Sequence, residues 1–187
     1  MYFNRTQSRL HEGLSHVGSA YRTIFSEFCG LPNTKPIARS AGRSSVAAAA
    51  YRSGTELVDM RTGLVHDYTW RDGVFYTEIM LPDGTSAERN ALWNAAESAE
   101  KRKDGRTGRE WIIALPAELD EDARQKLASA FGIELATRYG VAVDLAIHLP
   151  SREGDNRNHH AFVMTTTCND LQSKWPRPAI IAFFDRD

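Results

Sequence analysis

The predicted fold rests on two stretches of sequence, VAVDLAIHLP at residues 141–150 and HHAFVMTTT at residues 159–167. Both are short runs rich in apolar and β-branched residues, which is typical of strands. The polar segment SREGDNRN connects them. Two strands joined by a connection this short usually pair antiparallel. The sequence therefore predicts a β-hairpin near the end of the chain.

The period of two along each strand predicts which side chains share a face. One face of the first strand carries Ala142, Asp144, Ala146 and His148, and one face of the second carries His160, Phe162, Met164 and Thr166. If the strands pair, His148 and His160 become cross-strand neighbours with Cβ atoms about 5 Å apart. His159 is expected to point to the opposite face.

Two imidazoles at that spacing can share a metal ion. A single histidine is nevertheless more often a hydrogen-bonded core or surface residue. Glu110 begins the predicted strand EWIIALP (110–116) and could complete a site suited to Mg²⁺ or Mn²⁺. It could equally be a solvated charge at a strand edge, and the residues alone leave both interpretations open.

The rest of the chain alternates between helix and strand patterns. Helices are predicted at 20–28, from Ser44 to Gly54, at 86–102, and from an Asp120 cap to Gly140. A further strand is predicted at 73–82, ending in the turn Pro82-Asp83-Gly84. This order predicts an α+β fold in which helices cover a mixed, mainly antiparallel sheet.

A positively charged segment surrounds Tyr51, near the end of the alanine-rich helix. Residues 35–55 contain Lys35, Arg39, Arg43 and Arg52 and no acidic residue, a composition that suits a phosphate backbone. Arg39, Arg43 and Arg52 are therefore candidate DNA-binding residues. The basic stretch at 100–110 could act likewise, although such runs are usually solvated loops. Tyr51 itself could simply pack into the core.

Length and composition limit the remaining possibilities. The 187 residues, 42% of them hydrophobic, suit one globular domain, and the formal net charge is −1. Cys29 and Cys168 are far apart and suggest neither a disulfide framework nor a zinc site. No apolar run could span a bilayer, and the opening residues lack a signal-peptide pattern, so a cytoplasmic protein without membrane contact is expected.

Several of these segments together resemble the MobA/MobL family of relaxases, including the TraA-type proteins. They are IARSAGRSSVAAAAYRSG (37–54), TGLVHDYTWRDGV, LWNAAESAEKR, REWIIALPAEL and DLAIHLP. The resemblance implies a DNA-nicking domain over residues 35–167, with a divergent segment at 1–34 and a divergent tail at 168–187. It further implies that Tyr51 is the nucleophile, that His148 is a ligand of a divalent metal, and that Glu110 belongs to the site.

One motif departs from the family pattern. The family's remaining ligands are two histidines separated by one residue on a strand, and here the strand reads His159-His160-Ala161-Phe162. His160 matches the first of the two histidines, and Phe162 stands in place of the second. A phenyl ring has no lone pair for a metal, so Phe162 is expected to weaken metal binding and catalysis.

Two functional hypotheses follow. The first is strand nicking and transfer at a plasmid transfer origin, with Tyr51 as nucleophile and a divalent metal held by His148, His160 and either Glu110 or water. Its partners would be single-stranded DNA and other relaxosome proteins, with Tyr51 within reach of the histidine pair and Arg43 or Arg52 nearby. The second is a catalytically inactive remnant that binds single-stranded DNA. A structural domain without DNA contact is a weaker third alternative.

Overall fold

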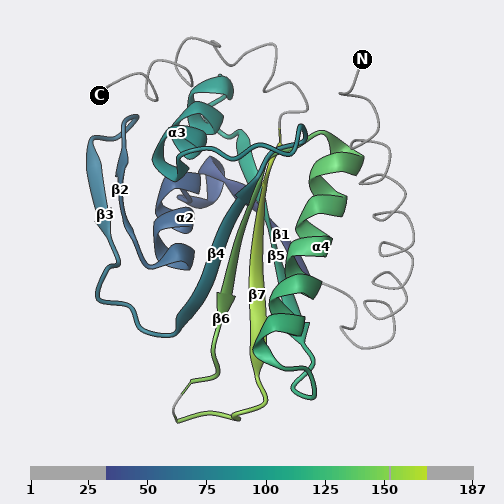
Figure 1. Ribbon diagram of the computed structural model, residues 1–187. Helices are drawn as coiled ribbons and strands as arrows, with labels where there is room; N and C mark the ends of the chain where they lie inside the picture. The colour runs from purple at the N-terminus through teal and green to yellow at the C-terminus, as the bar shows by residue number, and fades with distance from the viewer. Residues whose placement is uncertain (1–32, 152, 168–187) are drawn as a thin grey trace, which may run out of the picture.

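The computed structural model describes residues 33–151 and 153–167 (Figure 1). The predicted helix at 20–28 and the segment 168–187 lie outside the described residues. The elements in order are β1 (Asn33–Ala38), the 3-10 helix η1 (Arg39–Ala41), α2 (Ser45–Ser53), β2 (Glu56–Asp59), β3 (Leu64–Asp67), β4 (Val74–Met80), α3 (Arg89–Ala99), β5 (Arg106–Leu115), α4 (Glu121–Tyr139), β6 (Val143–His148) and β7 (His159–Thr166).

A five-stranded sheet with the order β1-β5-β7-β6-β4 forms the centre of the fold. Its four pairings are all antiparallel, so the predicted α+β class with a mainly antiparallel sheet is confirmed. The predicted hairpin is β6–β7, in which His148 lies opposite His160. Because β6 and β7 are flanked on both sides, the hairpin that carries the two histidines is in the interior of the sheet.

Helices cover both faces of this sheet, α4 on one side and α2 with α3 on the other (Figure 1). The alternation along β6 and β7 divides the core accordingly. Val143, Leu145 and Val163 belong to the cluster that packs under α4. Ala142 and Met164 belong to the cluster under α2 and α3. His148, His160 and Phe162 are in phase with the second set, so they face the side of the sheet that α2 covers.

The helix ends follow the predicted capping signals. The Ser44 side chain accepts a hydrogen bond from the Ala47 amide at the start of α2, and Asp120 accepts one from the Ala123 amide at the start of α4. Gly54 and Gly140 end these helices at φ values of 64° and 62°, a conformation that favours glycine. Tyr51 is thereby fixed in the last turn of α2.

The parts of the fold that were not predicted are β1 with η1, the hairpin β2–β3 and the first residues of β5. The hairpin β2–β3 forms a separate two-stranded sheet beside α2. Its sequence shows no hydrophobic alternation, because Val58, Leu64 and Val65 are exposed while Asp59 is buried. β5 begins at Arg106 instead of at Glu110, because Thr107 and Gly108 are buried within a segment that looks like a basic loop. None of the helices in the described residues is both long and apolar enough for a membrane span.

Candidate functional site

Three aromatic rings meet on the sheet face that α2 covers. The ring centroids of His148 and His160 are 5.4 Å apart, and Phe162 lies 4.9 Å from His148 and 5.1 Å from His160. Cross-strand pairing in β6–β7 produces this arrangement, because His148 is opposite His160 and Ala146 is opposite Phe162. The expectation that both histidines share one face is confirmed. The electrostatic contacts of His159 are instead with Glu121 and Arg124 at α4, on the other face.

Both ring nitrogens of His148 are engaged by neighbouring groups. Nε2 lies 2.7 Å from the carbonyl oxygen of Arg52 and therefore donates to it. Nδ1 then carries the lone pair and accepts from Nη2 of Arg71 at 3.4 Å. Burial lowers the pKa of His148 to about 4, and the charge of Arg71 adds to the lowering. His148 is consequently a neutral ring fixed between two arginines at neutral pH.

Tyr51 lies at the edge of this cluster and not in the apolar core, because 38% of its surface is exposed. The Tyr68 ring contacts it edge-on at a centroid distance of 5.2 Å. The guanidinium carbon of Arg71 lies 3.8 Å from the centroid of the Tyr51 ring. Arg71 thus bridges Tyr51 and His148, while a direct reach of the Tyr51 hydroxyl to the histidine pair stays a prediction.

Arg52 connects the helix to the other side of the cluster. Its guanidinium carbon lies 4.2 Å from the centroid of Phe162 and 5.0 Å from that of Tyr51. Nη2 of Arg52 forms an ion pair with the buried carboxylate of Glu110, and Nη2 of Arg43 lies 3.4 Å from the same oxygen. The structure therefore brings Glu110, Arg43 and Arg52 together as a group of two cations around one anion.

The residues of this cluster do not fit a divalent metal ion as they are arranged. Within residues 33–151 and 153–167, no group of three or more His, Cys, Asp or Glu is placed to hold one. Glu110 is bound by two arginines, and both nitrogens of His148 are engaged. Nδ1 of His160 contacts the carbonyl oxygen of Asn158 at 3.1 Å, which leaves its Nε2 as an acceptor. The ligand roles of these residues stay predictions.

Arg39, also a predicted DNA-binding residue, has a different environment. Its side chain is 12% exposed, and its guanidinium donates to the carboxylate and carbonyl of Glu97 and to the carbonyls of Glu100 and Arg102. All five of its donors are therefore occupied. The structure does not bring Arg39 to the Tyr51 cluster.

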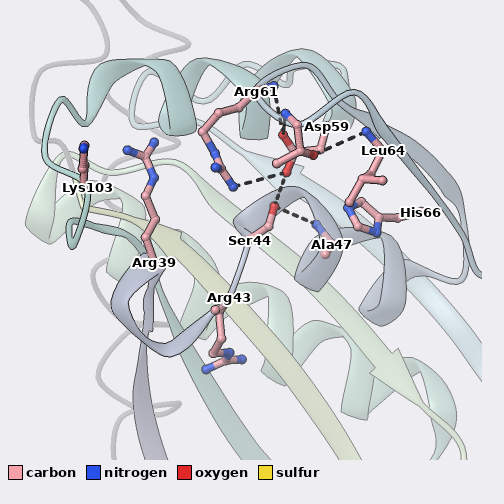
Figure 2. Close-up of a pocket in the computed structure, with 11 residues that line it drawn as sticks. Arg39, Arg43, Ser44, Ala47, Asp59, Arg61, Leu64, His66 and Lys103 are labelled. Carbon is pink, nitrogen blue, oxygen red and sulfur yellow. Dashed lines mark hydrogen bonds and ion pairs between the residues drawn. The ribbon is translucent and has the colours of Figure 1, made fainter.

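A separate pocket of about 340 Å³ lies between η1, the start of α2 and the β2–β3 hairpin (Figure 2). Four cationic side chains line it together with one buried carboxylate: Arg39, Arg43, Arg61, Lys103 and Asp59. Asp59 accepts a hydrogen bond from Ser44 and pairs with Arg61. The lining shares Arg43 with the cluster around Glu110 but does not include Tyr51 or the histidine pair, so the pocket lies beside the aromatic rings and does not contain them.

Comparison with known proteins identifies the family of the chain. Residues 43–176, well over half of the sequence, match the MobA/MobL family. The chain belongs to the MobA/MobL family. Within the described residues this family domain has an α+β fold.

Individual relatives of this MobA/MobL domain are longer proteins. It is 42% identical over 158 residues to the mobilization protein MobL of Acidithiobacillus ferridurans, a match covering 73% of this chain and 42% of MobL. It is 30% identical over 143 residues to the conjugal transfer protein TraA of Rhizobium radiobacter, covering 70% of this chain and 12% of TraA. The chain thus spans less than half the length of these relatives.

A solved structure shares the fold. It is described as "Molecular Basis of Vancomycin Resistance Transfer in Staphylococcus aureus", and it matches with a TM-score of 0.63 and 30% sequence identity. The match covers 72% of this chain and 68% of that one. A match over this much of both chains supports the α+β fold described above.

Sequence reasoning assigned no role to two residues of the cluster, Arg71 and Tyr68. Both lie in the segment TGLVHDYTWRDGV, which contributed to the family resemblance as a whole. Arg71 lies outside regular secondary structure, between β3 and β4, and 77 positions before His148. No periodicity in the sequence indicates a contact between Arg71 and His148. The sequence shows only that Arg71 lies in a segment that resembles the family.

Proposed function

We propose that this domain binds single-stranded DNA at a plasmid transfer origin and that Tyr51 attacks a phosphodiester of the bound strand. The observation that carries the proposal is the position of Tyr51. It is a partly exposed tyrosine in the last turn of α2, and its ring contacts Arg71, which also contacts His148. A phenol beside a guanidinium that has no acidic partner suits an attack on a phosphate.

The chemical step is an exchange of one phosphoester for another. The oxygen of Tyr51 forms a bond to phosphorus, and the bond from phosphorus to the 3′ oxygen breaks. The phenol loses its proton to water, and the leaving 3′ oxygen takes one up. The products are a 5′ phosphotyrosine and a free 3′ hydroxyl, and the reverse attack rejoins the strand. No step is assigned to a divalent cation, because His148, His160 and Glu110 do not form a ligand set in this structure.

In this mechanism the arginines act on the phosphate. Negative charge increases on the non-bridging oxygens during the attack, and guanidinium groups next to the nucleophile stabilise that charge. Arg71 contacts the Tyr51 ring face at 3.8 Å, and Arg52 lies 5.0 Å from it. His148 orients Arg71 by accepting from it, and the carbonyl of Arg52 orients His148.

The second candidate function is binding of single-stranded DNA without cleavage. Phe162 favours it, because this ring lies against both histidines where a further ligand is expected from the family resemblance. The exposed rings at this site, Tyr51 and Trp70, could still stack on bases.

One experiment separates the two candidates. The protein is incubated with 3′-labelled single-stranded transfer-origin oligonucleotides, and denaturing gels are examined for a covalent adduct. Tyr51→Phe should abolish the adduct while binding of the oligonucleotide is kept. Tyr139→Phe, at an exposed tyrosine that ends α4 on the other side of the sheet, is the matched control that should retain the adduct. Binding without any adduct in the wild type would support the second candidate, and no binding at all would contradict both.

A further inference from the structure

We propose that Arg52 and Arg71 form a guanidinium clamp for one backbone phosphate of the bound strand, and that in this chain the clamp takes the place of a divalent metal. The inference rests on the proposed function, because it concerns the phosphate next to Tyr51. It departs from the metal-dependent site that the family resemblance predicts. Four observations on the cluster support it.

The first observation is a pair of unsatisfied donors. Nε of Arg52 and Nη1 of Arg71 are buried and have no hydrogen-bond partner among the described residues. Buried donors almost always have an acceptor, and a charged donor without one is costly. Only four side-chain atoms in the described part of the chain are in this condition, and two of them belong to the two arginines that contact the Tyr51 ring. Oxygen atoms of a bound phosphate would provide the missing acceptors.

The second observation is the balance of charge. Arg43 and Arg52 share the single carboxylate of Glu110. Arg71 forms no ion pair with any carboxylate in residues 33–151 and 153–167. The cluster therefore has three guanidinium charges against one carboxylate. Such an excess attracts a phosphodiester and repels a divalent cation.

The third observation concerns the groups at the histidines. A metal ion bound to His148 would have to displace either the carbonyl of Arg52 from Nε2 or the guanidinium of Arg71 from Nδ1. Arg71 already lies on the lone-pair side of the ring at 3.4 Å, where a metal would bind. In this arrangement the neutral ring of His148 serves as a hydrogen-bond acceptor that positions Arg71.

The fourth observation gives Phe162 a positive role. Its ring lies 4.2 Å from the guanidinium carbon of Arg52, within the range of a cation–π contact. Tyr51 supports Arg71 in the same way at 3.8 Å. Two aromatic rings thus hold two planar guanidinium groups in place, and planar guanidinium groups bind phosphate in a bidentate manner. Phe162, which stands in place of the family's histidine, thus removes a metal ligand and also holds the guanidinium of Arg52.

The first test measures DNA binding by fluorescence anisotropy, with the full chain and a labelled single-stranded oligonucleotide. Wild-type affinity should be the same within about twofold in EDTA and in Mn²⁺. Arg71→Gln should lower the affinity about tenfold and reduce the salt slope by about one. Arg71→Lys should recover only part of the loss, since it keeps the charge and not the planar geometry. The control Arg138→Gln removes one exposed charge from α4, on the other sheet face, and should leave the affinity within about twofold.

The second test needs no DNA and measures Mn²⁺ binding by calorimetry. The wild type should show no site, Phe162→His a weak one, and Phe162→His combined with Arg71→Gln a stronger one, because the competing guanidinium is then gone. A wild-type Mn²⁺ site that disappears in His160→Ala would overturn the inference, as would Arg71→Gln binding DNA like the wild type. If the wild type forms no Tyr51 adduct but the Arg71 variants change DNA affinity as expected, only the nicking proposal is contradicted. A wild type that binds no oligonucleotide would contradict both proposals.

Discussion

Arg39 and Arg71 show two different uses of a partly buried arginine in the same small domain. Arg39 donates to a carboxylate and to three backbone carbonyls, and all its donors are occupied. Arg71 contacts one imidazole and one aromatic ring face, and one of its nitrogens is buried without a partner. A guanidinium whose donors all have protein acceptors, as in Arg39, stabilises the fold. A guanidinium with a buried donor that lacks an acceptor, as in Arg71 beside Tyr51, is suited to bind a ligand.

The largest expected effect is on stability, and it tests whether Arg39 stabilises the fold more than Arg71 does. Arg39→Gln should lower the free energy of unfolding by about 3 kcal/mol, because it leaves the carboxylate of Glu97, 1% exposed, without its principal partner. Arg71→Gln should change stability by less than about 1 kcal/mol. Urea unfolding of both variants measures the difference. Equal losses in the two variants would end the distinction between the two arginines.

A comparable effect is expected from pH. The pKa of His148 is about 4 in the folded protein, below the value of about 6.5 for an exposed histidine. The unfolded chain therefore binds more protons between these values, so stability should fall as the pH drops from about 6.5 to 4, by at most about 3 kcal/mol. His148→Gln keeps a donor for Arg52 and an acceptor for Arg71, and it should flatten the pH profile in this window. An unchanged slope would show that His148 is not held neutral.

The smallest expected effect concerns Arg61, at the pocket in Figure 2. It lies 3.8 Å from Asp59 and 3.5 Å from Glu97, and its side chain is 43% exposed. Exposed ion pairs contribute little, so Arg61→Gln should cost between about 0.2 and 1 kcal/mol in urea unfolding. A loss as large as that of Arg39→Gln would mean that Arg61 is the main partner of Glu97.

The sequence predicts those features of the molecule that depend on residues close together in the chain. The helices from Ser44 and from Asp120 have side-chain caps and a terminal glycine, so their bounds are predicted well. The phase of the β6–β7 hairpin follows from strict alternation, which is why His148 and His160 were placed on one face. Local patterns of this kind need no knowledge of the rest of the chain.

Contacts between distant segments are what the sequence does not predict. Arg71 reaches His148 from a loop, and its use as a partner depends on how the β2–β3 hairpin lies beside α2. Glu110 was expected at the start of a strand, with a metal as its partner. It lies within β5, opposite Lys35 on one side and Met164 on the other, where arginines of two other segments meet it. Such partners become visible only once the chain is folded.

The order of strands in the sheet has a consequence for how the domain forms during synthesis. Among the five strands, β6 and β7 are the single pair of sequence neighbours that are hydrogen-bonded to each other. Every other pairing joins strands with at least one element between them, and such long-range pairing slows folding. β7 is also the middle strand, so β5 and β6 have no common partner until residue 166 has left the ribosome. Until then β1 with β5, and β4 with β6, can form only separate two-stranded pieces with open edges, and the nascent domain is exposed to aggregation.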